Sequence, residues 1–273
     1  MMLKISYQFF LSNTFNYYIC YVINRTNMKR NLAIGIAGHK GAGKDTAASM
    51  ISYIIRNGNH AKFNEWLVKC DNVNKETIGR IGFGDALKEF LANSLNIDIR
   101  AFYSQRHKDE LWYDFEDKKF ITDKEINSHK LDENNLYVPV TQEVLYLNGL
   151  NIIDYNSPRE HYIIKLRTLL QWFGTDFIRH KFYGNAWVNI TCNKAKEILD
   201  KNHFVIFSDV RFQNEAVAIN NRFDAKIIKI DRNNETGDKH ESEVIDFYTD
   251  YFVDNNNSKM ALFYKLVNLI KEL

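Results

Sequence analysis

The segment that most restricts the fold of this chain is Asn31 to Met50, NLAIGIAGHKGAGKDTAASM. It begins with a short apolar run, Ile34 to Ala37, that predicts a buried strand, and it ends in the start of an amphipathic helix. Residues 38–44 between them fit G-x-x-x-x-G-K, the pattern of a loop that wraps a polyphosphate. Strand, glycine-rich loop and helix in this order predict phosphate binding.

The residue types in this loop suit phosphate chemistry. Gly38, Gly41 and Gly43 permit backbone conformations and close approaches that a Cβ atom would block, so successive N–H groups can point at phosphate oxygens. The helix that starts near Lys44 adds the positive end of its dipole, and the lysine supplies a mobile charge for the β- and γ-phosphates. The alternative is a tight turn with an incidental lysine, which the context disfavours.

One position departs from the usual pattern. Asp45 follows Lys44 directly, where Ser or Thr normally ligates Mg²⁺, and Thr46 comes next. We expect Thr46 to bond a phosphate and Asp45 to help hold the metal, directly or through water. Both are candidate Mg²⁺ residues, together with Asp209 further along the chain.

Composition limits the class of protein. With 273 residues, 45% hydrophobic and 26% charged, the chain has the composition of a soluble globular protein of one large domain, or of a domain with an insertion. A net charge of +2 without a stripe of basic and aromatic residues argues against nucleic-acid binding. Three isolated cysteines suit a reducing compartment and argue against disulfide or zinc frameworks, so we expect a cytoplasmic protein.

The first thirty residues are aromatic-rich but interrupted by polar side chains. Their longest apolar run, Tyr17 to Ile23, is far too short to span a membrane, and no small-residue cleavage site follows. We expect neither a membrane segment nor a signal peptide. We interpret residues 1–30 as a non-essential extension, with a packed extra segment as the alternative, and expect the domain proper at 31–273.

Four further apolar runs predict strands at 78–83, 203–207, 225–231 and 251–253, with helices between them. Five strands joined by crossover helices require a parallel sheet, which predicts an α/β sandwich. Residues 98–160 show no such alternation; they are polar, aromatic and helical in patches, and we expect an insertion that closes over a second substrate. The charged loop within 232–250 is interpreted as a lid or as ordinary surface.

Charged residues at predicted strand ends are candidates for the site. Asp209 follows the run HFVIF and precedes Arg211; it is interpreted as a metal-binding carboxylate, with a helix cap as the alternative. Asp85 and Lys88 follow the strand at 78–83, where open α/β sheets bind ligands, and Asp85 is equally well a cap.

The segment 167–187, RTLLQWFGTDFIRHKFYGNAW, combines an apolar helical stripe with polar residues. Arg167 and Gln171 lie one turn apart, Gly174-Thr175-Asp176 is expected to interrupt the helix, and Arg179 follows. One interpretation is a core helix with a solvated side. The other is a constellation that grips a nucleotide, with arginines on phosphate and an amide on a base edge.

From about Leu32 to Leu273 the chain resembles the phage-type deoxynucleoside monophosphate kinase family. The resemblance rests on five blocks in order: GHKGAGKDT at 38–46, FGDALK at 83–88, LLQWFGTDFIR at 169–179 with Trp187, SDVRFQNE at 208–215 and HESE at 240–243. Residues 100–160 match poorly and residues 1–30 have no counterpart.

The resemblance implies the nucleoside-monophosphate-kinase variant of the P-loop NTPase fold, a three-layer sandwich with a helical insertion and a lid. It implies transfer of phosphate from Mg-ATP to a dNMP, with small-molecule nucleotides as partners, often in a homodimer and in the service of viral DNA synthesis, hence in the host cytoplasm. A sister kinase acting on an acceptor such as dephospho-coenzyme A, or a non-catalytic nucleotide-binding regulator, are the alternatives.

It also implies residue roles. The ATP-binding residues would be Gly38, Gly41, Ala42, Gly43, Lys44, Asp45 and Thr46, with Arg232 on the lid side and Asn255 on the adenine side. The acceptor-binding residues would be Asp85, Lys88, Arg167, Gln171, Gly174, Thr175, Asp176, Arg179 and Trp187. The catalytic residues would be Lys44, Arg179, Asp209 and Arg211.

Overall fold

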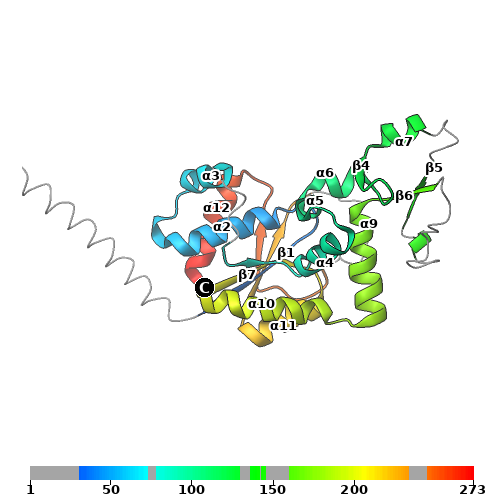
Figure 1. The fold of residues 1–273 in the computed structure, drawn as a ribbon. Coiled ribbons are helices and arrows are strands. Elements are labelled where there is room, and N and C mark those ends of the chain that lie inside the picture. Colours follow the sequence, from blue (N-terminus) through cyan, green and yellow to red (C-terminus); the bar gives the residue numbers. More distant parts are fainter. Residues whose placement is uncertain (1–30, 73–77, 130–135, 142, 146–159, 234–244) are drawn as a thin grey trace, which may run out of the picture.

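The centre of the molecule is a five-stranded sheet with helices on both faces (Figure 1). The computed structural model describes residues 31–72, 78–129, 136–141, 143–145, 160–233 and 245–273. Every strand pair in this sheet is parallel. In spatial order the strands are β2 (Arg80–Ile81), β7 (Phe204–Val210), β1 (Leu32–Ala37), β8 (Lys226–Asp231) and β9 (Tyr251–Asp254). The predicted parallel α/β sheet is confirmed.

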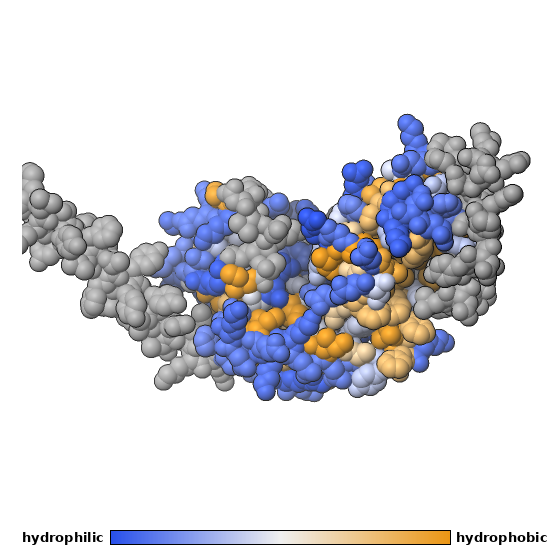
Figure 2. Space-filling model, viewed as in Figure 1, coloured by the Kyte–Doolittle hydropathy of each residue, from blue (hydrophilic) through white to orange (hydrophobic). Residues whose placement is uncertain are grey.

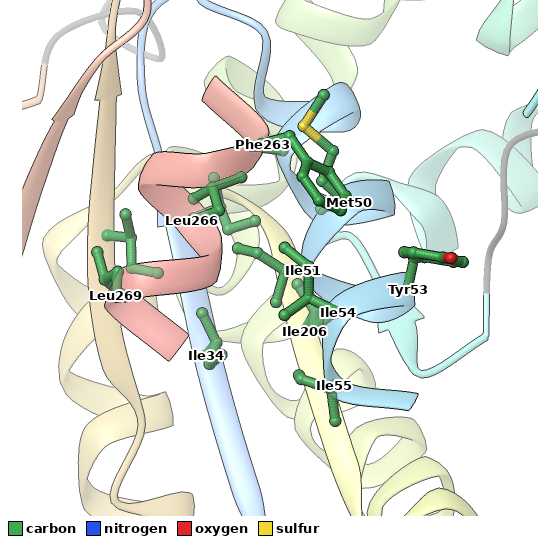
Figure 3. Packing of buried hydrophobic residues seen from close by; sticks show 14 of the residues in the cluster. Ile34, Met50, Ile51, Tyr53, Ile54, Ile55, Ile206, Phe263, Leu266 and Leu269 are labelled. Carbon is green, nitrogen blue, oxygen red and sulfur yellow. The ribbon is translucent and has the colours of Figure 1, made fainter. Parts of the chain in front are cut away.

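One face of the sheet is covered by helices from both ends of the chain. They are α2 (Lys44–Asn57), α3 (Phe63–Asn72) and α12 (Lys259–Glu272). Figure 3 shows Phe263 and Leu266 of α12 beside Met50 and Ile51 of α2, all with almost no exposed surface. Ser258 caps α12, because its side chain accepts a hydrogen bond from the backbone N–H of Ala261.

The opposite face carries α10 (Ala186–Asn202) and α11 (Gln213–Phe223), which pack on the inner strands through a second apolar cluster. These two helices lie where the apolar periodicity predicts them. Two features near β2 differ from expectation: β2 itself is only two residues long, and the mixed segment after α2 contains η1 (Gly58–His60) and α3. The apolar residues Phe63, Trp66 and Leu67 of α3 do recur at helical spacing, but this helix is shorter than the window over which a helical period is usually recognised.

Beside β2 lies α4 (Asp85–Leu95), and beyond it a side lobe formed by residues 99–164 (Figure 1). Its elements are α5 (Ile99–Tyr103), α6 (Gln105–Asp109), β3 (Trp112–Asp114), β4 (Lys119–Ile121), α7 (Asp123–His129), β5 (Leu136–Pro139) and β6 (Glu160–Ile164). The expected helical patches are confirmed, but the four-stranded sheet β4-β3-β6-β5 is not predicted. Strands of three to five residues are too short to show an alternating pattern.

The long helix after β6 joins the side lobe to the main sheet. Only Lys165 separates β6 from α9 (Leu166–Gln171), and α9 continues without a break into the π-helix η3 (Trp172–Phe182). The prediction that residues 174–176 interrupt the helix is therefore wrong. Gly174 allows close packing instead, since a Cβ atom there would lie 2.4 Å from Leu87 Cδ2. The indole of Trp187 donates to Gly174 O at 2.9 Å.

The interpretation of residues 1–30, and most of the predicted lid, lie outside the described residues. Within the part of the chain that the structure describes, no helix combines the length and the hydrophobicity that a bilayer crossing requires.

Candidate active site

A cleft of about 1170 Å³ lies at the carboxyl ends of β1, β2 and β7, where open α/β sheets bind ligands. Figure 2 shows the notch between the main body and the side lobe. Basic side chains predominate in its wall, which favours a multiply charged anion. The predicted residues that line it are Gly41, Lys44, Asp45, Asp85, Lys88, Arg167, Gln171, Gly174, Thr175, Arg179, Trp187, Asp209 and Arg211.

The glycine-rich loop forms one end of the cleft. Gly43, with φ of 96°, precedes α2, and Lys44 is the first helical residue. The Lys44 side chain is nearly buried, and its Nζ donates to the carbonyls of Gly38 at 2.6 Å and His39 at 3.0 Å. Lys44 is thus held inside its own loop, at the helix N-terminus where a phosphate is most favourably bound.

Asn255 supports this loop from behind. Its buried amide donates to Ala42 O at 2.8 Å, and a Cβ atom on Gly43 would lie 2.6 Å from the same amide nitrogen. Asn255 lies under the loop and is not part of the cleft wall, and its expected place on the adenine side stays a prediction. Gly38, Ala42 and Gly43 belong to the loop and Thr46 to α2, and none of these four residues is part of that wall.

Asp209 and Arg211, at the end of β7, face the loop. Asp209 Oδ1 accepts from Arg211 Nε at 2.7 Å and lies 3.9 Å from Lys44 Nζ. Burial alone would raise the pKa of Asp209, but the charges of Arg211, Lys44 and Lys88 outweigh burial and lower it to about 2. The carboxylate is therefore ionised throughout the neutral range, as a metal ligand or charge partner must be.

Asp45 meets a residue that the sequence analysis did not single out. Arg80, on β2, donates from Nη2 to Asp45 Oδ1 at 2.9 Å. Arg80 is mostly buried, and among the described residues nothing accepts from its Nε. The Asp45 side chain is largely exposed, so it lies at the mouth of the cleft with an arginine as partner.

Arg179 is held at the cleft by Glu215, the second residue that the sequence analysis missed. The guanidinium forms an ion pair with Glu215 and lies 4.1 Å from the centre of the Phe212 ring. Glu215 also accepts from the backbone N–H groups of Arg211 and Phe212, capping α11. Burial raises the pKa of Glu215, although Arg179 opposes the shift. Within the described residues no group accepts from Nη1 of Arg179, which leaves a buried donor for an anion.

Asp85 is engaged in local structure. It accepts from the backbone N–H of Gly82 at 2.7 Å, from Lys88 Nζ at 3.1 Å and from the Tyr103 hydroxyl at 2.9 Å. Burial and the nearby Asp85 raise the pKa of Tyr103, so this hydroxyl remains a donor. Asp85 orders the turn before α4 and orients Lys88, which lies 4.3 Å from the centre of the Tyr103 ring. The expected helix cap is not observed, since Gly84 is the N-cap residue of α4 and no side chain caps it. Asp85 lines the cleft, and its role toward a ligand stays a prediction.

The acceptor-side residues divide into two groups. Arg167, Gln171, Gly174 and Thr175 face the cleft from α9 and η3, whereas Asp176 is buried and is not in its wall. Arg232 is exposed just after β8 and is also outside the wall.

Further basic residues that were not predicted as site residues also reach the cleft. They are Lys40, Arg80, Arg100 and Lys108. Lys108 lies on α6; burial first, and then Arg167 and Lys88, lower its pKa to about 8. Within the side lobe only a count of basic residues could have pointed to Arg100 and Lys108.

A family model described as deoxynucleotide monophosphate kinase matches residues 113–266, more than half of the chain. The match spans α9, η3 and β7, whereas the glycine-rich loop lies before it and is identified from its own pattern and geometry. A search of curated proteins gives no match.

Proposed function

Because the chain belongs to the deoxynucleotide monophosphate kinase family, we propose that it transfers the γ-phosphoryl group of ATP to a deoxynucleoside monophosphate. One observation carries the proposal. The phosphate loop with Lys44 shares a single cleft with Arg167 and Arg179, so one site offers cations to a donor and to an acceptor phosphate.

In this proposal the loop residues 38–46 hold the phosphates of ATP. Their backbone N–H groups and the N-terminus of α2 attract the oxygens, while Lys44 moves from its carbonyl partners to the β- and γ-phosphates. Asn255 keeps the loop in shape through Ala42.

The acceptor lies on the opposite side, along α9 and η3. Arg167 and Arg179 bind its phosphate, while Gln171 and Thr175 face the nucleoside. An oxygen of the acceptor phosphate attacks the γ-phosphorus in line, the bond to the ADP oxygen breaks, and ADP leaves with the electron pair. An acceptor phosphate is already a competent nucleophile, so the residues contribute alignment and positive charge. Residues 98–160 would form the monophosphate-binding insertion, and 232–250 the lid.

Mg²⁺ is the metal that such a reaction uses. Of the three residues predicted to bind it, not all are placed to do so. Asp209 is an ionised carboxylate in the cleft, which suits a hard cation. Both carboxylates have an arginine partner, but Asp45 is largely exposed at the mouth of the cleft and Thr46 is outside the wall, so Asp209, beside Lys44, is the better-placed residue. When bound, the metal neutralises charge on the phosphates.

The test is a coupled assay of ADP release with Mg-ATP and a panel of dGMP, dTMP, dCMP, dAMP and their ribose forms. Lys44-dependent turnover with one or more deoxynucleoside monophosphates supports the proposal and defines base and sugar preference. If the protein binds ATP and no monophosphate is phosphorylated, the proposal fails, and dephospho-coenzyme A becomes the next acceptor to test. Binding of ATP without turnover on any acceptor would indicate a regulator.

A further inference from the structure

Asp109 connects two parts of the cleft that are far apart in the chain. It ends α6 in the side lobe, and its Oδ2 lies 3.1 Å from Lys40 Nζ in the phosphate loop. Its Oδ1 accepts from Arg167 Nε of α9 at 2.7 Å, and Arg167 Nη2 approaches Oδ2 at 3.4 Å. One carboxylate thus joins a cation beside the donor phosphates to a cation on the acceptor side.

The surroundings keep this carboxylate charged and in place. Burial would raise the pKa of Asp109, but hydrogen bonds and charges from Arg167 and Lys40 lower it overall. The side chains of Lys40, Asp109 and Arg167 are 29%, 22% and 19% exposed, so solvent screens their attraction less than at an open surface. Lys165 Nζ also donates to the backbone carbonyl of Asp109 at 3.1 Å, which fixes the end of α6.

Lys40 and Arg167 both line the cleft, whereas Asp109 lies behind them. The carboxylate therefore sets where the two cations point without occupying the space for substrate. A forked contact to Arg167 restricts the guanidinium to one plane, which matters because arginine binds phosphate through a fixed geometry. Lys40 and Arg167 share this partner. A change that orders one of these side chains therefore also orders the other.

We propose that Asp109 is a positioning residue that couples the ATP half and the acceptor half of the cleft through Lys40 and Arg167. This inference rests on the proposed function. ATP that orders Lys40 also orders Asp109 and Arg167, so the acceptor meets an arginine already in place and binds more tightly. The affinity for the acceptor rises because ATP, when it binds first, has already reduced the conformational freedom of the shared residues.

The experiment measures binding by isothermal titration calorimetry, using the deoxynucleoside monophosphate that is the best substrate. Its dissociation constant is determined with and without a saturating non-hydrolysable ATP analogue. We expect the analogue to tighten acceptor binding roughly 10-fold in the natural protein, within the usual range of coupling between sites. In Asp109→Asn this gain disappears, while binding of the analogue alone changes less than about two-fold.

Two further variants separate positioning from general damage. Asp109→Glu keeps a carboxylate within reach of both cations and is expected to retain most of the gain. Asp117→Asn removes a carboxylate from another lysine pair of the side lobe, outside the cleft, and is expected to keep all of it. Near-ultraviolet circular dichroism confirms that each variant is folded.

The outcomes distinguish this inference from the proposed function. If the natural protein binds and phosphorylates the acceptor but the analogue leaves acceptor affinity unchanged, the coupling is refuted and the kinase assignment stands. The same holds if Asp109→Asn retains the full gain. If the natural protein binds no monophosphate at all, the proposed function falls and the coupling with it.

Discussion

The Nζ atom of Lys44 lies 3.9 Å from Oδ1 of Asp209, and the two residues reach this point from β1 and β7, which are neighbours in the sheet. Parallel pairing brings both carboxyl ends to one edge, so residues far apart in sequence meet in one charged cluster. Asp209 and the two loop carbonyls together hold the lysine in the cleft.

Lys44→Ala is expected to lower phosphoryl transfer by at least about 100-fold, because it removes a preorganised charge from the transferred group. The coupled assay measures turnover, and a thermal melt measures the fold, which should be intact because α2 tolerates alanine at its first position. Near-normal turnover from a folded sample would rule out the phosphate-loop assignment.

Gly43→Ala is expected to weaken ATP binding roughly 10- to 100-fold, because the new Cβ atom would push against Asn255 and displace the loop. Gly58→Ala is the matched control: Gly58 also has a positive φ, of 53°, yet a Cβ atom there meets nothing within 4 Å. Both variants also incur backbone strain on the order of 1–3 kcal/mol, because neither backbone conformation suits a residue with a Cβ atom. Only Gly43→Ala should change the affinity for ATP measured by calorimetry. If Gly58→Ala weakens ATP binding as much as Gly43→Ala does, the supporting role of Asn255 is contradicted.

Glu215→Ala is expected to lower the free energy of unfolding by about 3 kcal/mol, since it leaves the Arg179 guanidinium buried without its counter-charge. It also removes the acceptor for two backbone N–H groups at the start of α11. Urea denaturation provides the measurement. Glu89→Gln, which breaks an exposed pair with Lys194, should change stability by no more than about 0.5 kcal/mol. A loss below about 1 kcal/mol for Glu215→Ala would show that the pair is dispensable.

Acceptor affinity is expected to fall as pH rises through about 8, because Lys108 then loses its charge. Burial, Arg167 and Lys88 lower the pKa of Lys108, while Asp109 and Asp45 oppose them. The KM for the acceptor is measured from pH 7 to 9. It should begin to rise near pH 8 in the natural protein and in Lys196→Met, the control variant at an exposed lysine. Lys108→Met should show a higher KM at pH 7 and no rise near pH 8. A rise that persists in this variant would assign the titration to another group.

The lowered pKa of Lys108 also makes the free energy of unfolding depend on pH. Between about pH 8 and 10.5 the folded protein binds fewer protons at Lys108 than the unfolded chain does. This residue therefore makes the free energy of unfolding rise with pH across that window. Urea denaturation at several pH values should show a smaller rise in Lys108→Met than in the natural protein.

The main sheet and the phosphate loop could be predicted because their signals are local. The apolar run of β1, the glycines and the start of α2 follow one another without interruption. β7 begins with the apolar run FVIF, and the apolar residues of β8 are Ile227, Ile228 and Ile230. The side lobe could not be predicted in the same way. Its strands are short, and partners such as Trp112 and Ile121 pair across a turn that carries little periodic signal.

Within the candidate site, prediction failed where a role depends on contact between distant elements. Arg80 belongs to no quoted motif, and the block at 208–215 that ends in Glu215 does not reveal its partner. The partners Asp45 and Arg179 come from other elements of the fold. Asn255 was placed near the cleft by resemblance, yet only the fold shows that its amide supports Ala42. The widening of the helix at Gly174 depends on packing against Leu87, which sequence spacing does not encode.

The single residue between β6 and α9 leaves the side lobe no slack relative to the helix that carries Arg167. When the four-stranded sheet tilts, the start of α9 has to move with it, because only Lys165 lies between β6 and α9. Substitutions far from the cleft, in β3 or β4, thereby gain a mechanical route to the acceptor.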